Sequence, residues 1–345
     1  MTDSVNTSVT DKQIVEAILA DSPDHAPGTR PIHAIGIACE GYFSPLEAAP
    51  NYCIAPQFQL EKVPATVRFS NGSGSGVEHD GWSDVRGMAT RFHLPDGAAA
   101  DLVAMTLGEF FVPDIKAFMA FTKAAAPMQP KREPPWSKIL NMLQLKPPLP
   151  DPPEDKPYDN ADGLLQFAVH HRYSDFSIFE VGMIGAPVSY ARAAYHAVNT
   201  FVVIAPDGRR RHVRFHWLPV AGVQKTDPTK PPMAKYLHNE LRERLAKWPA
   251  RFMLNMVIGE NGDALCDPTR PWPRRRKSIE MGTLTLTGVC EDQEKNSEKI
   301  AFNPCRVPPG IELSADPILQ VRKGAYEKSR EMRGGTACPF QAEGK

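Results

Sequence analysis

The chain has 345 residues, 42% of them hydrophobic, which is enough for a large core in one domain or at most two. Lysine plus arginine and aspartate plus glutamate both number 40, so the formal net charge is zero, which argues against nucleic acid or an anionic membrane as the main partner. No apolar run has the length of a membrane span, and residues 1–20 lack the basic and apolar regions of a secretory leader, so we expect a cytoplasmic protein.

The six cysteines are scattered along the chain and include no Cys-x-x-Cys pair. In an intracellular chain of this size they are expected to be reduced thiols, not a disulfide framework. Structural zinc ligands come in closely spaced pairs, and these cysteines do not. The sequence therefore predicts neither disulfides nor a zinc site.

The first part of the chain predicts one short helix followed by strands. Residues Asp11 to Leu19 place Ile14, Ala17 and Ile18 on one face, which is typical of an amphipathic helix. A proline-rich loop follows, and after it come strand-like runs separated by turn residues. These runs are Ile32–Phe43, Ala65–Ser70, Gly87–Leu94 and Leu102–Thr106. The glycine-rich loop 71–76 lacks the Gly-Lys-Ser/Thr ending of a phosphate-binding loop.

The rest of the chain predicts helices and strands around a proline-rich connection. Helices are expected at Ile115–Ala125, Gly163–His171 and Met233–Lys247, with a short helical insert at Trp136–Leu145 inside the proline-rich stretch 127–157. Strands are expected at Thr200–Ala205 and His212–Leu218, joined across the turn 206–208, and at Arg251–Ile258 and Gly282–Val289. Because strands dominate the first two thirds, the sequence predicts one α+β domain built on a β-barrel with appended helices.

A final helix is expected from about Asp316 to Met332. Ser314 is the predicted N-cap, and the glycine pair at 334 and 335 supplies the stop.

On this helix Arg322 and Tyr326 are four residues apart, so their side chains lie on one face. A neighbouring permanent cation favours the ionised phenol, which is a good ligand for ferric iron. Arg333, two turns further on, falls on roughly the same face and can reach a carboxylate bound alongside. By spacing alone, however, an ordinary surface pair is the more common explanation.

The segment Arg30-Pro-Ile-His33-Ala-x-Gly is, taken alone, typical of a structural histidine at the start of a strand. It is followed in order by further segments, and together they resemble the haem catalase family over most of residues 29–335. The segments are Val67-Arg68-Phe69-Ser70, Asp84-Val85-Arg86-Gly87-Met88-Ala89, Asp101-Leu102-Val103 and Val307-Pro-Pro-Gly through Arg322-x-x-x-Tyr326.

The resemblance implies a catalase-like antiparallel β-barrel that binds one haem b. In that family the tyrosine ligates the haem iron, which here is Tyr326, and the arginine four residues earlier supports it, which is Arg322. His33 corresponds to the distal acid/base, and Ser70 to the residue that orients it.

Three arginines correspond to those that bind the haem propionates: Arg30, Arg68 and Arg333. A guanidinium suits this role because it binds a carboxylate through two parallel hydrogen bonds. Phe111, next to Phe110, and Phe118 fall where the family places aromatic residues near the haem.

The chain also departs from typical members. They carry a longer N-terminal arm and a C-terminal helical domain, which the resemblance implies are lacking here. We therefore expect an N-terminal arm with a short helix at 1–28, a haem domain at 29–335 and a tail at 336–345. Glu327 replaces the proline that follows the tyrosine in the family.

A further departure concerns an amide that positions peroxide beside the distal histidine in the family. The corresponding residues are Met105 and Thr106. Thr106 offers one hydroxyl, whereas Met105 offers a weakly accepting thioether, and the sequence does not say which of them faces the iron. Together the departures resemble the catalase-related peroxidases, a minimal branch of the family.

The resemblance thus implies a haem peroxidase that reduces hydrogen peroxide or organic hydroperoxides with a small organic electron donor, with at most weak catalase activity. A homo-oligomer, most simply a dimer, is expected. The alternatives are a compact catalase, a fatty-acid hydroperoxide isomerase and a haem carrier without turnover. The isomerase branch carries a threonine before the distal histidine, where this chain has Ile32. A carrier has no need of a distal base such as His33.

Overall fold

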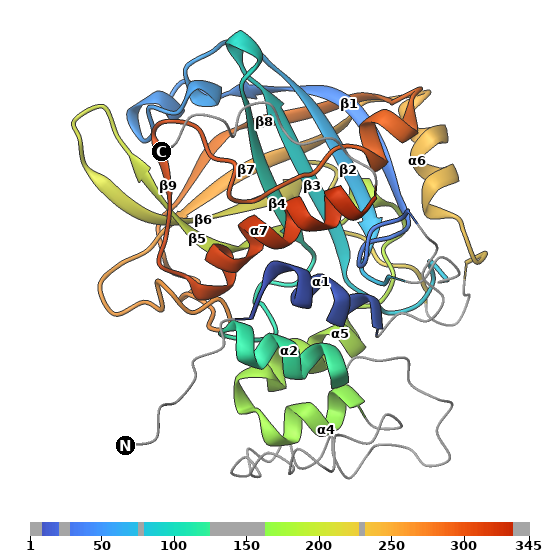
Figure 1. The fold of residues 1–345 in the computed structure, drawn as a ribbon. Helices are drawn as coiled ribbons and strands as arrows, with labels where there is room; N and C mark the ends of the chain where they lie inside the picture. Colours follow the sequence, from blue (N-terminus) through green and yellow to red (C-terminus); the bar gives the residue numbers. More distant parts are fainter. Residues whose placement is uncertain (1–8, 21–27, 75–78, 125–162, 228–231, 334–345) are drawn as a thin grey trace.

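The computed structural model describes residues 9–20, 28–74, 79–124, 163–227 and 232–333 (Figure 1). Its centre is an antiparallel barrel whose strands neighbour one another in the order β4-β3-β2-β1-β8-β7-β6-β5, with β9 added beside β5. The bridge between Met105 of β4 and His196 of β5 closes the ring. The sheet therefore curls round until β4 and β5, at the two sides of the barrel, meet at this point. The predicted α+β barrel is therefore confirmed.

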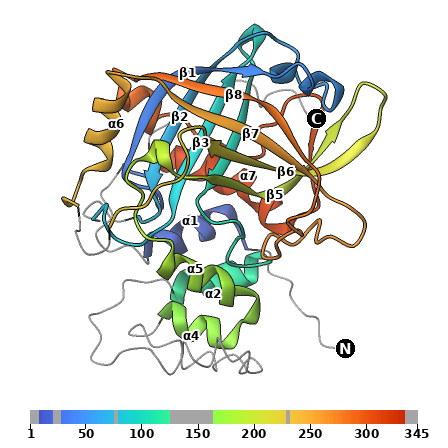
Figure 2. The same cartoon turned by 180° about the vertical axis from the view of Figure 1, so that it is seen from behind.

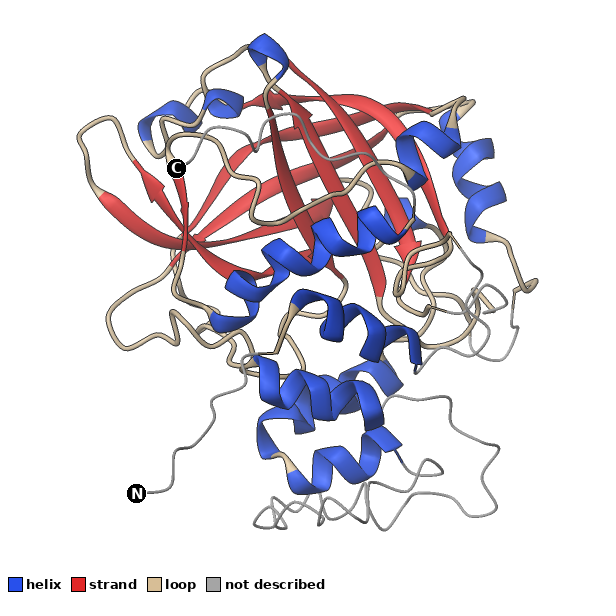
Figure 3. Ribbon diagram, viewed as in Figure 1, coloured by secondary structure: helices blue, strands red, loops and turns tan. Residues whose placement is uncertain are grey.

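The strands are β1 (Gly36–Pro45), β2 (Val63–Asn71), β3 (Arg86–His93), β4 (Ala99–Met105), β5 (Tyr195–Ile204), β6 (Arg210–Pro219), β7 (Ala250–Ile258), β8 (Ser278–Val289) and β9 (Ile311–Leu313). The longer helices are α1 (Asp11–Ala20), α2 (Ile115–Ala124), α4 (Gly163–His170), α5 (Asp175–Met183), α6 (Leu237–Leu245) and α7 (Pro317–Met332). Figure 3 separates them by colour.

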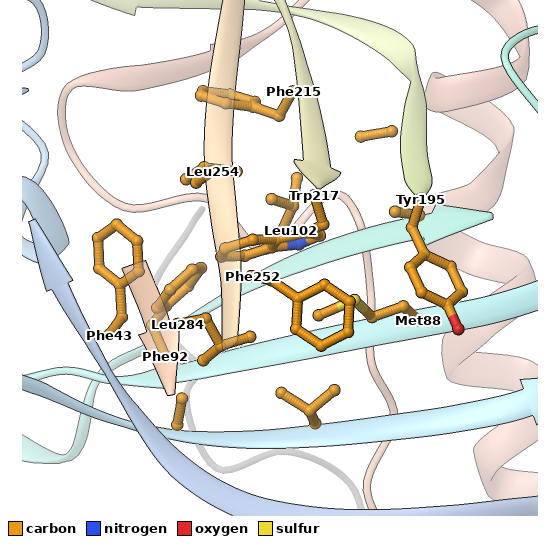
Figure 4. Close-up of a cluster of buried hydrophobic side chains, with 14 of the residues drawn as sticks. Phe43, Met88, Phe92, Leu102, Tyr195, Phe215, Trp217, Phe252, Leu254 and Leu284 are labelled. Atoms are coloured by element: carbon orange, nitrogen blue, oxygen red, sulfur yellow. The ribbon is translucent and has the colours of Figure 1, made fainter. Parts of the chain in front are cut away.

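Large apolar side chains fill the inside of the barrel (Figure 4). On β7, Phe252, Leu254 and Met256 are buried and alternate with more exposed neighbours, as the two-residue period of a strand requires. Phe43 packs edge-to-face on Phe92, with ring centroids 5.4 Å apart. Because the interior is occupied by side chains, a site for a large ligand has to lie outside the barrel wall.

The helices cover one part of that wall. Helix α7 runs across the outer face of the barrel, α1 lies beside it, and α2, α4 and α5 form a layer beyond α1 (Figures 1 and 2). This layer has a small core of its own, built around Phe167, Ile178 and Val112, which also receives Ile318 from α7. The cavity described below lies between the barrel wall, α1 and α7.

Several sequence predictions are confirmed within a few residues. The hairpin of β5 and β6 turns through Gly208, whose φ of 78° suits glycine. The five cysteines in the described residues are all free. No helix in the same residues is long and apolar enough to cross a membrane. The predicted insert 136–145, the tail 336–345 and the glycine stop of the last helix lie outside the described residues.

Other predictions were wrong. Strand β1 starts at Gly36 and not at Ile32, because the backbone of His33 has a φ of 57°, which no strand accommodates. Helix α6 starts at Leu237, four residues later than expected, and α5 and β9 were not predicted. The N-cap of α7 is Asp316, not Ser314: its Oδ1 accepts the N–H groups of the first helical turn at 2.9 and 3.3 Å.

A buried carboxylate ties the segment before α7 to the barrel. Asp101 of β4 accepts two hydrogen bonds of 2.7 Å from Arg91 of β3, one of 2.6 Å from Arg306 and one of 2.8 Å from the N–H of Asn303. Burial raises the pKa of Asp101 to about 6, although Arg91 opposes this. Asp101 thus joins Arg91 of the barrel to Arg306 of the segment before α7, and it fixes where the chain leaves the barrel toward α7.

Replacing Asp101→Asn is expected to destabilise the fold by about 3–5 kcal/mol, because it removes the buried counter-charge of Arg91 and leaves Arg306 with only the 3.7 Å contact to Glu327. The measurement is the free energy of unfolding in urea. The matched control is Asp207→Asn, which removes the carboxylate of an exposed pair with Arg209 and is expected to leave the midpoint unchanged. Equal urea midpoints for the two variants would contradict the role of Asp101.

Candidate active site

A cavity with two adjoining halves lies between β3, β4, α1 and α7. The arginine half is lined by Arg30, Arg68 and Arg333, and the apolar half by Met105, Phe110, Phe118 and His196. They enclose about 800 and 810 Å³, each with its opening to solvent included, which is the size range of small-molecule and cofactor sites. His33 and Tyr326 line both halves, so the two side chains stand at the boundary between them.

The orientation of the His33 ring is set by two residues of β2. Nδ1 lies 2.8 Å from the carbonyl oxygen of Asn71 and 3.1 Å from Oγ of Ser70. A carbonyl oxygen only accepts hydrogen bonds, so Nδ1 carries the proton and Nε2 is the bare nitrogen left for a substrate. Burial lowers the pKa of His33 to about 4, with Arg68 adding to this and Asp84 opposing it. At neutral pH the ring is therefore an uncharged base.

Glycine at two positions lets the strands come close enough for this arrangement. A Cβ at position 87 of β3 would lie 2.7 Å from Oγ of Ser70 and 3.0 Å from the His33 ring. A Cβ at position 36 would lie 2.3 Å from Cζ of Arg68. Contacts this short do not occur, so any larger residue at Gly36 or Gly87 would displace His33 or Arg68.

On α7 a chain of hydrogen bonds leads from the helix N-terminus to the Tyr326 oxygen. Arg322 donates to Oη of Tyr326 at 2.6 Å and, through its other terminal nitrogen, to Oδ1 of Asn199 at 2.7 Å. Nδ2 of Asn199 donates to Asp316 at 2.7 Å. Asn199 and Asp316 are both buried. Arg322 is thus held by β5 as well as by its own helix.

The three arginines of the arginine half are only partly satisfied by protein. Arg30 donates to the carbonyl oxygens of Ser297 and Ile300 at 2.5 and 2.6 Å, but its Nε is buried without a partner. Nε and Nη1 of Arg333 are buried and unpartnered as well. Burial lowers the pKa of Arg30 well below its ordinary value, and the charges of Arg68 and Arg333 lower it further. Arg30 and Arg333 therefore have N–H groups that no atom of the described residues accepts.

One carboxylate does lie among these cations. Glu298 contacts Arg68 at 3.3 Å. Burial acts to raise the pKa of Glu298, but Arg68, the Ser297 hydroxyl and Arg30 outweigh it, so the pKa is lowered and the group is ionised. Three guanidinium groups and one carboxylate leave an excess of two positive charges, which a ligand with two carboxylates would neutralise.

Two of the expected cavity residues lie elsewhere. Phe110, not Phe111, lines the apolar half, where it stacks on Phe118 at 6.3 Å, whereas Phe111 turns toward the helical layer and stacks on Phe121 at 4.8 Å. The Thr106 hydroxyl accepts the N–H of Arg86 at 3.0 Å, and Thr106 is not among the cavity-lining residues. Met105 lines the apolar half instead.

The structure also adds residues that sequence reasoning missed. Asn199 and Glu298 carry no local signal for these roles, because their partners Arg322 and Arg68 are 123 and 230 residues away along the chain. The bond between Asp316 and Asn199 spans 117 residues and has no local signal either. The spacing of four residues on α7 points to Arg322 and Tyr326. It does not point to Asn199 of β5, whose Oδ1 accepts a hydrogen bond from Arg322. The unpaired atoms of Arg30 and Arg333 are likewise visible only when the fold brings the arginines together.

Comparison with known sequences places these features in context. The family model described as Catalase matches residues 3–147 and 151–339. The chain is 32% identical to a catalase-related peroxidase of Mycolicibacterium paratuberculosis, covering 92% of each chain. It is 27% identical to a catalase-related peroxidase of Synechococcus elongatus, covering 95% of this chain and 89% of the relative. A match of 28% to Catalase-2 of Bacillus subtilis covers 90% of this chain but 46% of that one.

Solved structures show the same fold. A fungal catalase superposes with a TM-score of 0.73 at 21% identity, covering 89% of this chain and 59% of the other. Catalase A from Saccharomyces cerevisiae superposes with a TM-score of 0.71 at 21% identity, covering 89% of this chain and 61% of the other. This chain therefore spans about six tenths of the length of these two structures.

Proposed function

The chain belongs to the catalase family, and we propose that it is a haem-dependent peroxidase that reduces hydrogen peroxide, or an organic hydroperoxide, with a small organic electron donor. The observation that carries the proposal is the cavity boundary, where the bare Nε2 of His33 and the Arg322-bonded oxygen of Tyr326 line the same space. The two relatives that this chain covers to 92% and 89% of their length are both named catalase-related peroxidases, which supports the choice of peroxidase.

The residues present suit a haem. The unpaired N–H groups of Arg30 and Arg333, and the excess of two positive charges, match the two propionates of haem b. The walls of the apolar half match its macrocycle, and the phenol oxygen of Tyr326 is a ligand that ferric iron accepts. When bound, the haem supplies the redox chemistry that cleaves the peroxide O–O bond.

The side chains of the protein handle protons and charge around that chemistry. Nε2 of His33 takes the proton from one peroxide oxygen and returns it to the oxygen that leaves as water. Ser70 and the Asn71 carbonyl keep the ring in the required tautomer. Tyr326 would hold the iron, and the hydrogen bond from Arg322 stabilises negative charge on its oxygen. Arg30, Arg68 and Arg333 would hold the propionates.

Peroxidase is favoured over catalase because no amide side chain lines either half of the cavity in the described residues. A neutral hydrogen bond of the kind that such an amide makes contributes roughly 0.5–1.5 kcal/mol, which is about tenfold in rate or less. Oxygen evolution from peroxide should therefore be weakened, whereas one-electron oxidation of an organic donor does not need the amide.

Replacing Tyr326→Phe is expected to abolish the absorption spectrum of phenolate-ligated haem, or haem retention altogether, because the iron loses its protein ligand. The measurements are the absorption spectrum and the haem content of the purified protein. Tyr42→Phe, on the outer surface of β1, is the control and should leave both unchanged. An unaltered spectrum in Tyr326→Phe would refute the ligand assignment.

Replacing His33→Ala is expected to keep the haem but to slow the reaction with peroxide by at least about a hundredfold, which is the lower range for general acid–base catalysis. Stopped-flow absorption after mixing with peroxide measures this rate. In the wild type the rate constant should be flat above roughly pH 5 and fall toward pH 4, where Nε2 becomes protonated. His93→Ala, at the exposed end of β3, is the control and should leave the rate unchanged. A near-native rate in His33→Ala would instead favour a haem carrier.

Met105→Asn should raise oxygen evolution relative to donor oxidation, by about tenfold at most, because it places an amide in the cavity wall. Thr106→Asn is the matched control, since the Thr106 hydroxyl points to the Arg86 backbone, and it should not raise the ratio. Both rates are measured with a phenolic donor and an oxygen electrode. If the wild type evolves oxygen as fast as a full-length catalase measured alongside, the chain is a compact catalase.

A further inference from the structure

Met105, the last residue of β4, lies next to His33 on the outer wall of the barrel. Its partner in register on β3 is Gly87, and a Cβ at position 87 would lie 3.0 Å from Cε1 and Nδ1 of the His33 ring. Side chains of residues opposite each other on neighbouring strands point to the same face, with Cβ atoms roughly 4.5–5.5 Å apart. The Met105 side chain therefore stands alongside the His33 ring, and both residues line the apolar half of the cavity.

The two side chains belong to the same side of the cavity. His33 is held against β2 by its hydrogen bonds, and Met105 ends β4, so both stand on the barrel wall. Tyr326 belongs to α7, which runs across the barrel and forms the opposite wall (Figure 1). A peroxide bonded to the bare Nε2 of His33 would therefore be close to the thioether of Met105.

A methionine in a cavity wall is most often a flexible side chain that fills a gap. Met105 differs from such a filler in two respects. Among the described residues that line the apolar half, it is the only one that contains sulfur. It is also partly exposed, whereas Met88 and Met256 are fully buried. Peroxides convert an accessible thioether to a sulfoxide, so the position of Met105 makes it a target for the substrate that His33 is placed to activate.

We propose that Met105 is a site of self-modification, which the protein oxidises to methionine sulfoxide in the presence of peroxide. The sulfur attacks one peroxide oxygen, and the S–O bond forms as the O–O bond breaks. Nε2 of His33 takes the proton from the transferred oxygen and gives it to the other oxygen, which leaves as water, or as an alcohol from an organic hydroperoxide. The sulfur loses two electrons, and the peroxide gains them.

The modification changes the chemistry of the cavity wall beside His33. A sulfoxide is polar and accepts hydrogen bonds, whereas the thioether is apolar and accepts them only weakly. The inference rests on the proposed function, because it requires peroxide beside His33. Since an electron donor and Met105 compete for the oxidising power of the same peroxide, the sulfoxide should accumulate when donor is scarce. Enzymes that reduce methionine sulfoxide can reverse the change, which suits a response to excess peroxide.

The test is peptide mass spectrometry of the haem-loaded protein after addition of hydrogen peroxide without an electron donor. The rate at which each methionine gains one oxygen is measured in the same sample. Met233 is 76% exposed and reports uncatalysed oxidation in solution, and the buried Met256 should stay unmodified. Met105 should be oxidised faster than Met233, and in His33→Ala the ratio of the two rates should fall by at least about a hundredfold, the lower range for general acid–base catalysis.

His93→Ala is the matched control and should keep the wild-type ratio, because His93 is exposed at the far end of β3. If His33→Ala does not fold, His33→Gln carries the same comparison with a side chain that cannot move the proton. A wild-type Met105 that is oxidised no faster than Met233 overturns the inference, and so does a ratio that the His33 variant leaves unchanged.

The rate of peroxide reduction with an organic donor, measured on the same proteins, separates this inference from the proposed function. A rate that depends on His33 together with an unmodified Met105 contradicts the self-modification alone. A rate that does not depend on His33 contradicts the proposed function, and the self-modification with it.

Discussion

The carboxylate of Asp316 is the interaction on which the site depends most. One oxygen caps the first turn of α7 and the other accepts from Asn199 of β5, so a single buried group sets both the start of the helix and its position against the barrel. Arg322 is two turns further along, and its contact with the same Asn199 fixes the guanidinium that bonds Tyr326. If the residue that bonds Asn199 stood one position earlier in the helix, the face that carries Arg322 and Tyr326 would rotate by about 100° relative to the barrel.

The barrel explains why the cavity lies where it does. Its interior is packed with aromatic and aliphatic side chains, so it supports the site without containing it. The Asp101 network lies on the outer face of β4 and joins the barrel wall to the segment before α7. The outer faces of β3 and β4 carry the small residues that line the cavity, and α1 and α7 form the opposite wall. Electrostatics divides the space: unpaired guanidinium groups at one end suit anionic groups of a ligand, and apolar side chains at the other suit its uncharged part.

Local patterns were enough to predict most of the elements. The i, i+4 spacing of Arg322 and Tyr326 depends only on helix geometry, and their hydrogen bond forms as that geometry requires. The start of β1 could not be predicted, because the positive φ of His33 is imposed by its contacts with residues 70–72, which are distant in sequence. Ser314 and Asp316 are both good N-cap residues, and the choice between them was made by Asn199, which only the fold brings near.

By itself, the sequence determined the fold class, the family resemblance and which arginines, histidine and tyrosine to examine, since these follow from periodicity and from motifs a few residues long. Only the tertiary structure decided that Phe110 and Met105, rather than Phe111 and Thr106, line the cavity. Strand β4 ends at Met105, and the Thr106 side chain is directed to β3 by its hydrogen bond with the Arg86 N–H. No local pattern encodes that contact. The tertiary structure also decided that the carboxylate of Glu298 contacts Arg68 and lies near Arg30 and Arg333. Such pairings depend on distances between residues far apart in the chain, and those distances exist only once the barrel has closed.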